Sequence, residues 1–72
     1  MSKASTKAEI DRKKAYVTAK RAEAALWRSR KTGSKDKSYK AHCDENIRRI
    51  QADIANRTKE IASLRERMKY EK

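Results

Sequence analysis

Few residues of this chain have side chains suited to covalent or metal chemistry. The sequence contains one histidine and one cysteine, His42 and Cys43, which are neighbours in the chain. On a helix, adjacent side chains point about 100° apart, so these two cannot form a nucleophile–base pair by themselves. A single His and a single Cys cannot complete a zinc site, and no glycine-rich phosphate loop is present. The sequence therefore predicts no enzyme activity, no metal and no cofactor.

Positive charge is the chemical feature that remains. The 72 residues include 21 Lys and Arg against 10 Asp and Glu, which gives a formal net charge of +11 at pH 7. An excess of this size points to nucleic acid, an anionic surface or an acidic protein as the partner. A lone cysteine allows no internal disulfide, and no apolar run approaches the length of a membrane span. We therefore expect a reducing, cytoplasmic location.

The composition predicts an all-α protein. The chain has no Pro and a single Gly, which argues against folds that depend on many turns. Thr6 followed by Glu9 matches a capping box, in which hydroxyl and carboxylate satisfy each other's backbone N–H groups. That box predicts a first helix over about residues 7–32. Gly33 is expected to close this helix in a left-handed conformation.

A second helix is expected directly after a short turn. The turn takes residues 33–36, and either Asp36 or Ser38 can cap a helix that runs over about residues 37–70. Two helices joined by so short a turn are expected to lie antiparallel. The sequence therefore predicts one helical-hairpin domain over residues 1–72.

The second predicted helix carries the clearest apolar pattern. Its seam residues recur in steps of three and four for nearly four heptads, with one polar break at Arg57. The seam consists of Cys43, Ile47, Ile50, Ile54, Ile61, Leu64 and Met68. Such a stripe is typical of helix-on-helix packing in a coiled-coil-like hairpin.

Four alanines and one leucine of the first predicted helix gather on one side of a helical wheel. They lie within an arc of roughly 60° and, in an antiparallel hairpin, come opposite the isoleucines of the second helix. These residues are Ala8, Ala15, Ala19, Ala22 and Leu26. The pattern predicts that alanines and isoleucines interdigitate in the seam, with Asp11 neutralising Arg57.

The opposite side of the first helix is expected to be a cationic outer face. It covers an arc of about 140° and also contains Ile10, Val17 and Ala24. Its candidate nucleic-acid-binding residues are Lys7, Lys13, Lys14, Lys20, Arg21, Arg28 and Lys31. Such a face is suited to phosphates and predicts little sequence specificity for DNA or RNA. Tyr16 and Trp27 flank it, either to stack on bases or to pack in an interface.

Two other uses of this face stay open. The line Ile10–Val17–Ala24, ringed by cations, is suited to docking on an acidic groove of a larger protein, as an adaptor or inhibitor would. A solvated face that keeps the protein soluble is the plainest interpretation. An anionic membrane is disfavoured because the line lacks Leu and Phe.

The thin apolar seam also predicts a homodimer, either a four-helix bundle or a longer coiled coil.

Overall fold

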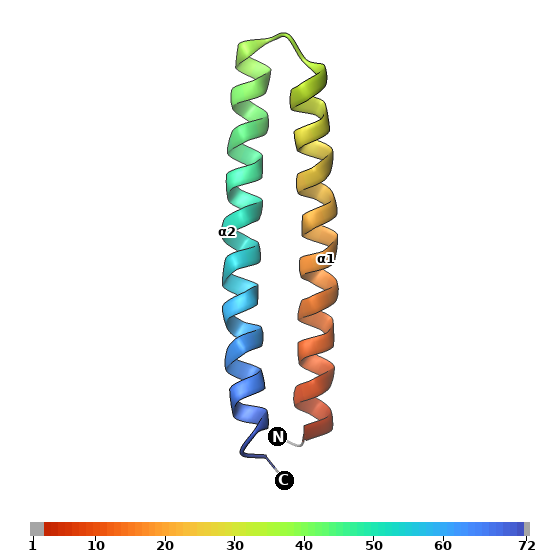
Figure 1. Ribbon diagram of the computed structural model, residues 1–72, viewed down its shortest axis with the longest axis vertical. Coiled ribbons are helices and arrows are strands. Elements are labelled where there is room, and N and C mark those ends of the chain that lie inside the picture. Colours follow the sequence, from red (N-terminus) through yellow and green to blue (C-terminus); the bar gives the residue numbers. More distant parts are fainter. Residues whose placement is uncertain (1–2, 72) are drawn as a thin grey trace.

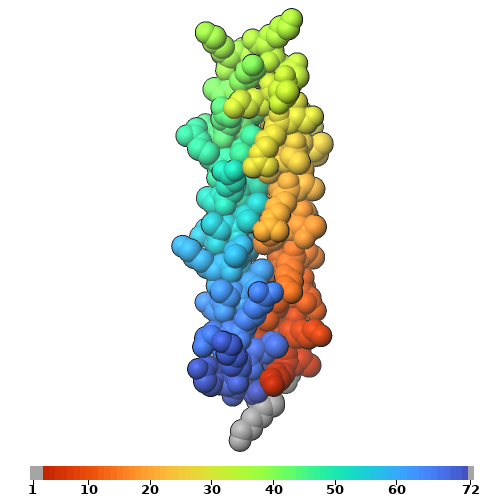
Figure 2. Space-filling view, viewed as in Figure 1, coloured from red at the N-terminus to blue at the C-terminus, as the bar shows by residue number. Residues whose placement is uncertain are grey.

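The protein is a hairpin of two long antiparallel helices. A computed structural model describes residues 3–71, and within them α1 spans Lys3–Gly33 and α2 spans Lys37–Met68 (Figure 1). No strand occurs in this part of the chain. The Cα trace of the rod extends over 56 × 14 × 12 Å along its principal axes, and the two helices pack side by side along its length (Figure 2). The predicted all-α hairpin is confirmed; the remaining residues of the predicted domain, 1, 2 and 72, lie outside the described residues.

The first helix begins earlier than the capping box predicted. It starts at Lys3, so Thr6 lies inside the first turns of α1 instead of capping it. The Thr6 side chain is 0% exposed, and its hydroxyl donates to the Glu71 carboxylate, with oxygen–oxygen distances of 2.8 and 3.0 Å. The prediction of an N-cap at Thr6 is wrong, because this hydroxyl ties the start of α1 to the segment after α2.

The connection at residues 34–36 is short and stabilised by local hydrogen bonds. The Ser34 N–H donates to the Lys31 carbonyl at 3.2 Å, and the Ser34 hydroxyl accepts from the Asp36 N–H at 3.1 Å. The Asp36 carboxylate accepts from the Ser38 N–H at 2.9 Å and caps α2, as predicted. No residue between 3 and 71 has a positive φ, so the predicted left-handed Gly33 is wrong: this glycine is the last helical residue of α1.

Replacement of Gly33 by alanine is expected to stabilise the hairpin. Gly33 is the last residue of α1 and its φ is not positive, and a Cβ built on it meets nothing within 4 Å. Alanine has the higher helix propensity and fewer conformations in the unfolded chain, so Gly33→Ala should raise the free energy of unfolding by about 0.5 to 1 kcal/mol. Urea denaturation followed by circular dichroism measures the change. A loss of stability would contradict the helical assignment of Gly33.

The seam predicted for α2 is confirmed. All seven residues of this seam face α1. Five are buried: Cys43, Ile47, Ile50, Ile61 and Leu64. The other two, Ile54 and Met68, are partly buried against the core. The heptad pattern therefore identified the inner face of α2 correctly.

The seam predicted for α1 is wrong. Its buried apolar residues are Ile10, Val17 and Ala24, which follow one another at seven-residue intervals. The predicted seam residues instead face solvent, and Leu26 among them is 59% exposed. The exposed set is Ala8, Ala15, Ala19, Ala22 and Leu26. Relative to the prediction, α1 is turned by roughly half a revolution about its own axis.

Larger apolar side chains explain this orientation. Ile10 and Val17 join Ile61 and Leu64 in one buried cluster. Burying an aliphatic side chain of this size contributes about 1.5 to 3 kcal/mol, whereas an alanine offers only a methyl group. Lysines near the seam do not prevent this packing, because a lysine stem can lie on apolar surface while its ammonium group reaches the edge.

Candidate nucleic-acid interface

The orientation of α1 divides the predicted cationic face into two parts. Because Ile10, Val17 and Ala24 lie at the centre of that face, α2 covers its middle. Lys13, Lys20 and Lys31 are half-buried beside the seam and form ion pairs. The other four cations are exposed, and none of them forms an ion pair with any residue in the described range 3–71. We call these four the cationic edge: Lys7, Lys14, Arg21 and Arg28.

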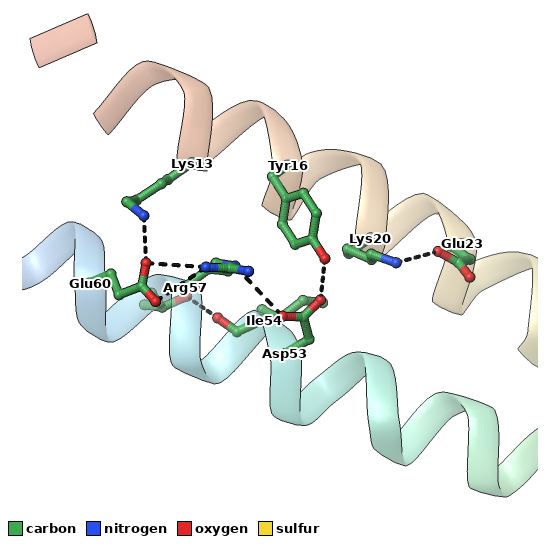
Figure 3. A network of polar contacts seen from close by, with 9 residues as sticks. Lys13, Tyr16, Lys20, Glu23, Asp53, Ile54, Arg57 and Glu60 are labelled. Carbon is green, nitrogen blue, oxygen red and sulfur yellow. Dashed lines mark hydrogen bonds and ion pairs between the residues drawn. The ribbon is translucent and has the colours of Figure 1, made fainter. Parts of the chain in front are cut away.

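The opposite edge of the hairpin is a network of alternating charges (Figure 3). The Lys13 ammonium group donates to the Glu60 carboxylate at 2.5 Å, and the Arg57 guanidinium lies 3.2 Å from the same carboxylate. Arg57 also lies 3.6 Å from the Asp53 carboxylate, which accepts a 2.5 Å hydrogen bond from the Tyr16 hydroxyl. The polar break in the α2 seam is thus neutralised at the rim of the helix pair.

Asp11 takes no part in neutralising Arg57, contrary to the prediction. Asp11 is exposed, whereas Arg57 pairs with the two acids of its own helix. The other lysines beside the seam have separate partners. Lys20 pairs with Glu23 at 3.1 Å, and Lys31 pairs with Asp44 across the helices at 2.6 Å.

Glu60 is the centre of this network and makes the hairpin sensitive to acid. The hydrogen bond from Lys13, together with the charges of Lys13 and Arg57, holds the pKa of Glu60 below its ordinary value of 4.5, although desolvation opposes the shift. A carboxyl whose pKa is lowered by folding stabilises the fold fully above its unfolded pKa. That contribution is lost as the pH falls through the lower, folded-state pKa.

Acidification is therefore expected to destabilise the wild-type protein more than it destabilises the Glu60→Gln variant. The stability that Glu60 contributes is complete at pH 7 and declines below about 4.5, until the carboxylate is protonated at its lower folded-state pKa. The glutamine variant lacks a titrating group at this position, so its urea midpoint should fall less between pH 7 and pH 3. Equal decreases in the two proteins would contradict a role for Glu60 in stability.

The cationic edge is a straight row along the rod. Its members are spaced by seven residues, which corresponds to about 10.5 Å of helix rise between neighbours. Beside the centre of the row, Lys14 and Arg21 of α1 share a shallow groove with Arg65 of α2. The remaining lining residues are Val17, Thr18, Thr58 and Ile61. The two helices therefore place three cations around one surface groove.

A second groove follows on the same edge near the turn. Arg28, Lys31 and Lys40 line it, together with Asp44, whose carboxylate is bound to Lys31. Sequence reasoning missed Arg65 and Lys40 as members of this surface. Both belong to α2, and their position beside the cationic edge becomes visible only once the orientation of α1 is known.

The two aromatic residues singled out in the sequence both make contacts within the hairpin. Trp27 is half-buried, with its ring edge-on to His42 at 5.6 Å between centroids and the Arg30 guanidinium 5.0 Å above it. The Tyr16 ring lies 5.1 Å from the Arg57 guanidinium. These contacts favour packing over base stacking for both residues.

No metal site is visible among the described residues. Within 3–71, no three His, Cys, Asp or Glu side chains are grouped so that they could hold an ion, and Cys43 is buried. Neither helix in this range is long and apolar enough to cross a membrane.

Comparison with protein-family models, curated proteins and solved structures finds no match to this chain.

Proposed function

We propose that this protein binds nucleic acid through its cationic edge, with little sequence specificity. The edge holds four exposed cations without acidic partners in residues 3–71, while the acids of the seam region are paired with other bases. Unpaired Lys and Arg side chains in a row can each neutralise a backbone phosphate and release its counterions. Phosphate contacts carry no sequence information, so the expected affinity is general.

The observation that supports this proposal best is the division of charge between the two edges. A surface whose only task is solubility is served as well by mixed charges. On the edge around Glu60 the bases and acids are paired, whereas the four cations of the cationic edge have no acidic partner among residues 3–71. The acid that lines a groove of the cationic edge, Asp44, is bound to Lys31. A one-signed row is the arrangement that a polyanion recognises.

Docking through the line Ile10–Val17–Ala24 is not available to the folded hairpin. That line is buried against α2, which argues against an adaptor or inhibitor that docks through it. An acidic protein that binds the cationic edge itself is the competing proposal. A complex that survives nuclease treatment and contains one stoichiometric protein would favour it over nucleic acid.

The proposed function predicts co-purification with nucleic acid and a steep salt dependence. Protein purified at low salt should show a high A260/A280 ratio that falls after nuclease and about 1 M salt, because counterion release drives the binding. For a duplex, a plot of log K against log salt should have a slope of about −4, one contact for each cation of the edge. A ratio unaffected by nuclease, with a slope near zero, would contradict the proposal.

The homodimer and the cytoplasmic location stay predictions. The stripe Ala8–Ala15–Ala22 and Leu26 are exposed on the outer face of α1, so they are accessible to a second copy. Close approach of helices over small residues is compatible with a four-helix bundle.

A further inference from the structure

We infer that the nucleic acid bound by the cationic edge is double-stranded, held from outside by its phosphates, and that Arg65 of α2 takes part. This inference rests on the proposed function and names the class of ligand. It depends on three features of the edge: the absence of aromatic side chains from its grooves, the width of the two-helix surface, and the cation that α2 adds.

The grooves of the cationic edge contain no aromatic residue among those described. Proteins that bind single strands without sequence preference combine a positive groove with aromatic rings on which unpaired bases stack. In this hairpin, Tyr16 lies on the opposite edge with its hydroxyl bound to Asp53, and Trp27 packs against His42. A ligand on the cationic edge therefore finds charge but no stacking surface, which suits a duplex whose bases are already stacked.

The width of the surface prevents the hairpin from entering a groove of the duplex. A helix with its side chains is about 10 to 12 Å across, so two packed helices present about 20 Å. The major groove of B-DNA is about 12 Å wide and admits one helix, not two side by side. The edge can therefore reach phosphates on the rims but not the base edges, in agreement with binding that ignores sequence.

Arg65 extends the row of cations from one helix to two. It lines the same groove as Lys14 and Arg21 and forms no ion pair with any residue between 3 and 71. A phosphate seated in this groove can be neutralised from both helices at once. Reversing the charge at Arg65 should then weaken duplex binding, even though Arg65 lies on α2 and not on α1.

The test compares strands, duplexes and one matched pair of variants. Fluorescence anisotropy is measured with a labelled 20-nucleotide strand and its 20-base-pair duplex, as DNA and as RNA, for wild type, Arg65→Glu and Lys59→Glu. Lys59 is an exposed α2 lysine with no ion pair among residues 3–71, so its reversal changes the net charge equally. Circular dichroism confirms that each variant keeps the helicity of the wild type.

The expected result is a duplex bound at least about fivefold more tightly than its own strand, for DNA, RNA or both. Arg65→Glu should lower duplex affinity at least about fivefold, and Lys59→Glu less than about twofold. Single strands bound as tightly as duplexes would overturn the inference but leave the proposed function standing. Equal effects of the two reversals would overturn the part played by Arg65. Absence of binding to every probe would overturn the proposed function as well.

Discussion

Replacing Ile10 and Val17 together by asparagine is expected to unfold the hairpin, whereas replacing Ala15 and Ala22 in the same way is not. Val17 is 5% exposed and Ile10 4% exposed, and both contact the core cluster. Each replacement removes about 1.5 to 3 kcal/mol of apolar burial and leaves an amide without water. The combined loss of about 5 kcal/mol or more equals the whole stability of many small domains.

Asparagine is chosen over aspartate because a buried aspartate could be stabilised by ion pairs with the nearby cations, whereas the uncharged amide of asparagine could not. The alanine pair is the matched control: it has the same seven-residue spacing and the same new side chain, at positions that face solvent. The control should lose only the difference in helix propensity, about 0.5 kcal/mol or slightly more at each position. Urea denaturation followed by circular dichroism compares the two. Equal losses, or a larger loss in the alanine pair, would show that α1 packs through its alanines.

Charge reversal of the cationic edge is expected to abolish binding of nucleic acid without unfolding the protein. Lys14, Arg21 and Arg28 are exposed and form no ion pair with the described residues, so Lys14→Glu, Arg21→Glu and Arg28→Glu remove no ion pair from the hairpin. Three phosphate contacts become repulsive. The affinity for a duplex should fall at least about 100-fold at low salt, and the salt slope should approach zero.

A second triple variant separates this effect from the loss of net charge. Arg12→Glu, Lys35→Glu and Lys59→Glu change the charge by the same amount at exposed positions away from the edge. This control should keep most of the affinity, because phosphates bind where cations are lined up beside one another. If both triple variants bind equally weakly, overall charge and not the cationic edge is responsible. Full-strength binding by the edge variant would exclude the edge as the interface.

The features that the sequence predicted correctly depend on local or strongly periodic signals. The cap at Asp36 needs only a carboxylate two residues before Ser38, and the inner face of α2 follows from aliphatic residues in unbroken heptad steps. The hairpin follows from two helices and one short connection. Each of these signals can be recognised without knowing what the other helix does.

The face of α1 was mispredicted because two stripes compete on the same helix. One stripe contains many alanines; the other has Ile10, Val17 and Ala24 separated by lysines, which made it look like a solvent face. The outcome depends on where lysine ammonium groups can find acids, and Glu60 and Asp44 lie on the other helix. The bond from Thr6 to Glu71 joins residues 65 positions apart, so no local pattern indicates it.

The orientation of α1 also determines which of the predicted cations belong to the candidate binding site. Of the seven cations expected on one outer face, Lys13, Lys20 and Lys31 are paired beside the seam, and the other four form the cationic edge. The sequence therefore predicted that these seven cations share one side of α1, but not their division into cations with an acidic partner and cations without one. That division decides which cations are available to a ligand.

Titration of the isotope-labelled protein with a 20-base-pair duplex, followed by amide chemical shifts in solution NMR, locates the surface that binds the duplex. We expect the largest shifts along the cationic edge and its central groove, at Lys14, Thr18, Arg21 and Arg65, with little change along the alanine stripe of α1 or around Glu60. Largest shifts at Ala15 and Ala22, or around Tyr16 and Glu60, would contradict the claim that the unpaired row of cations is the surface that meets nucleic acid.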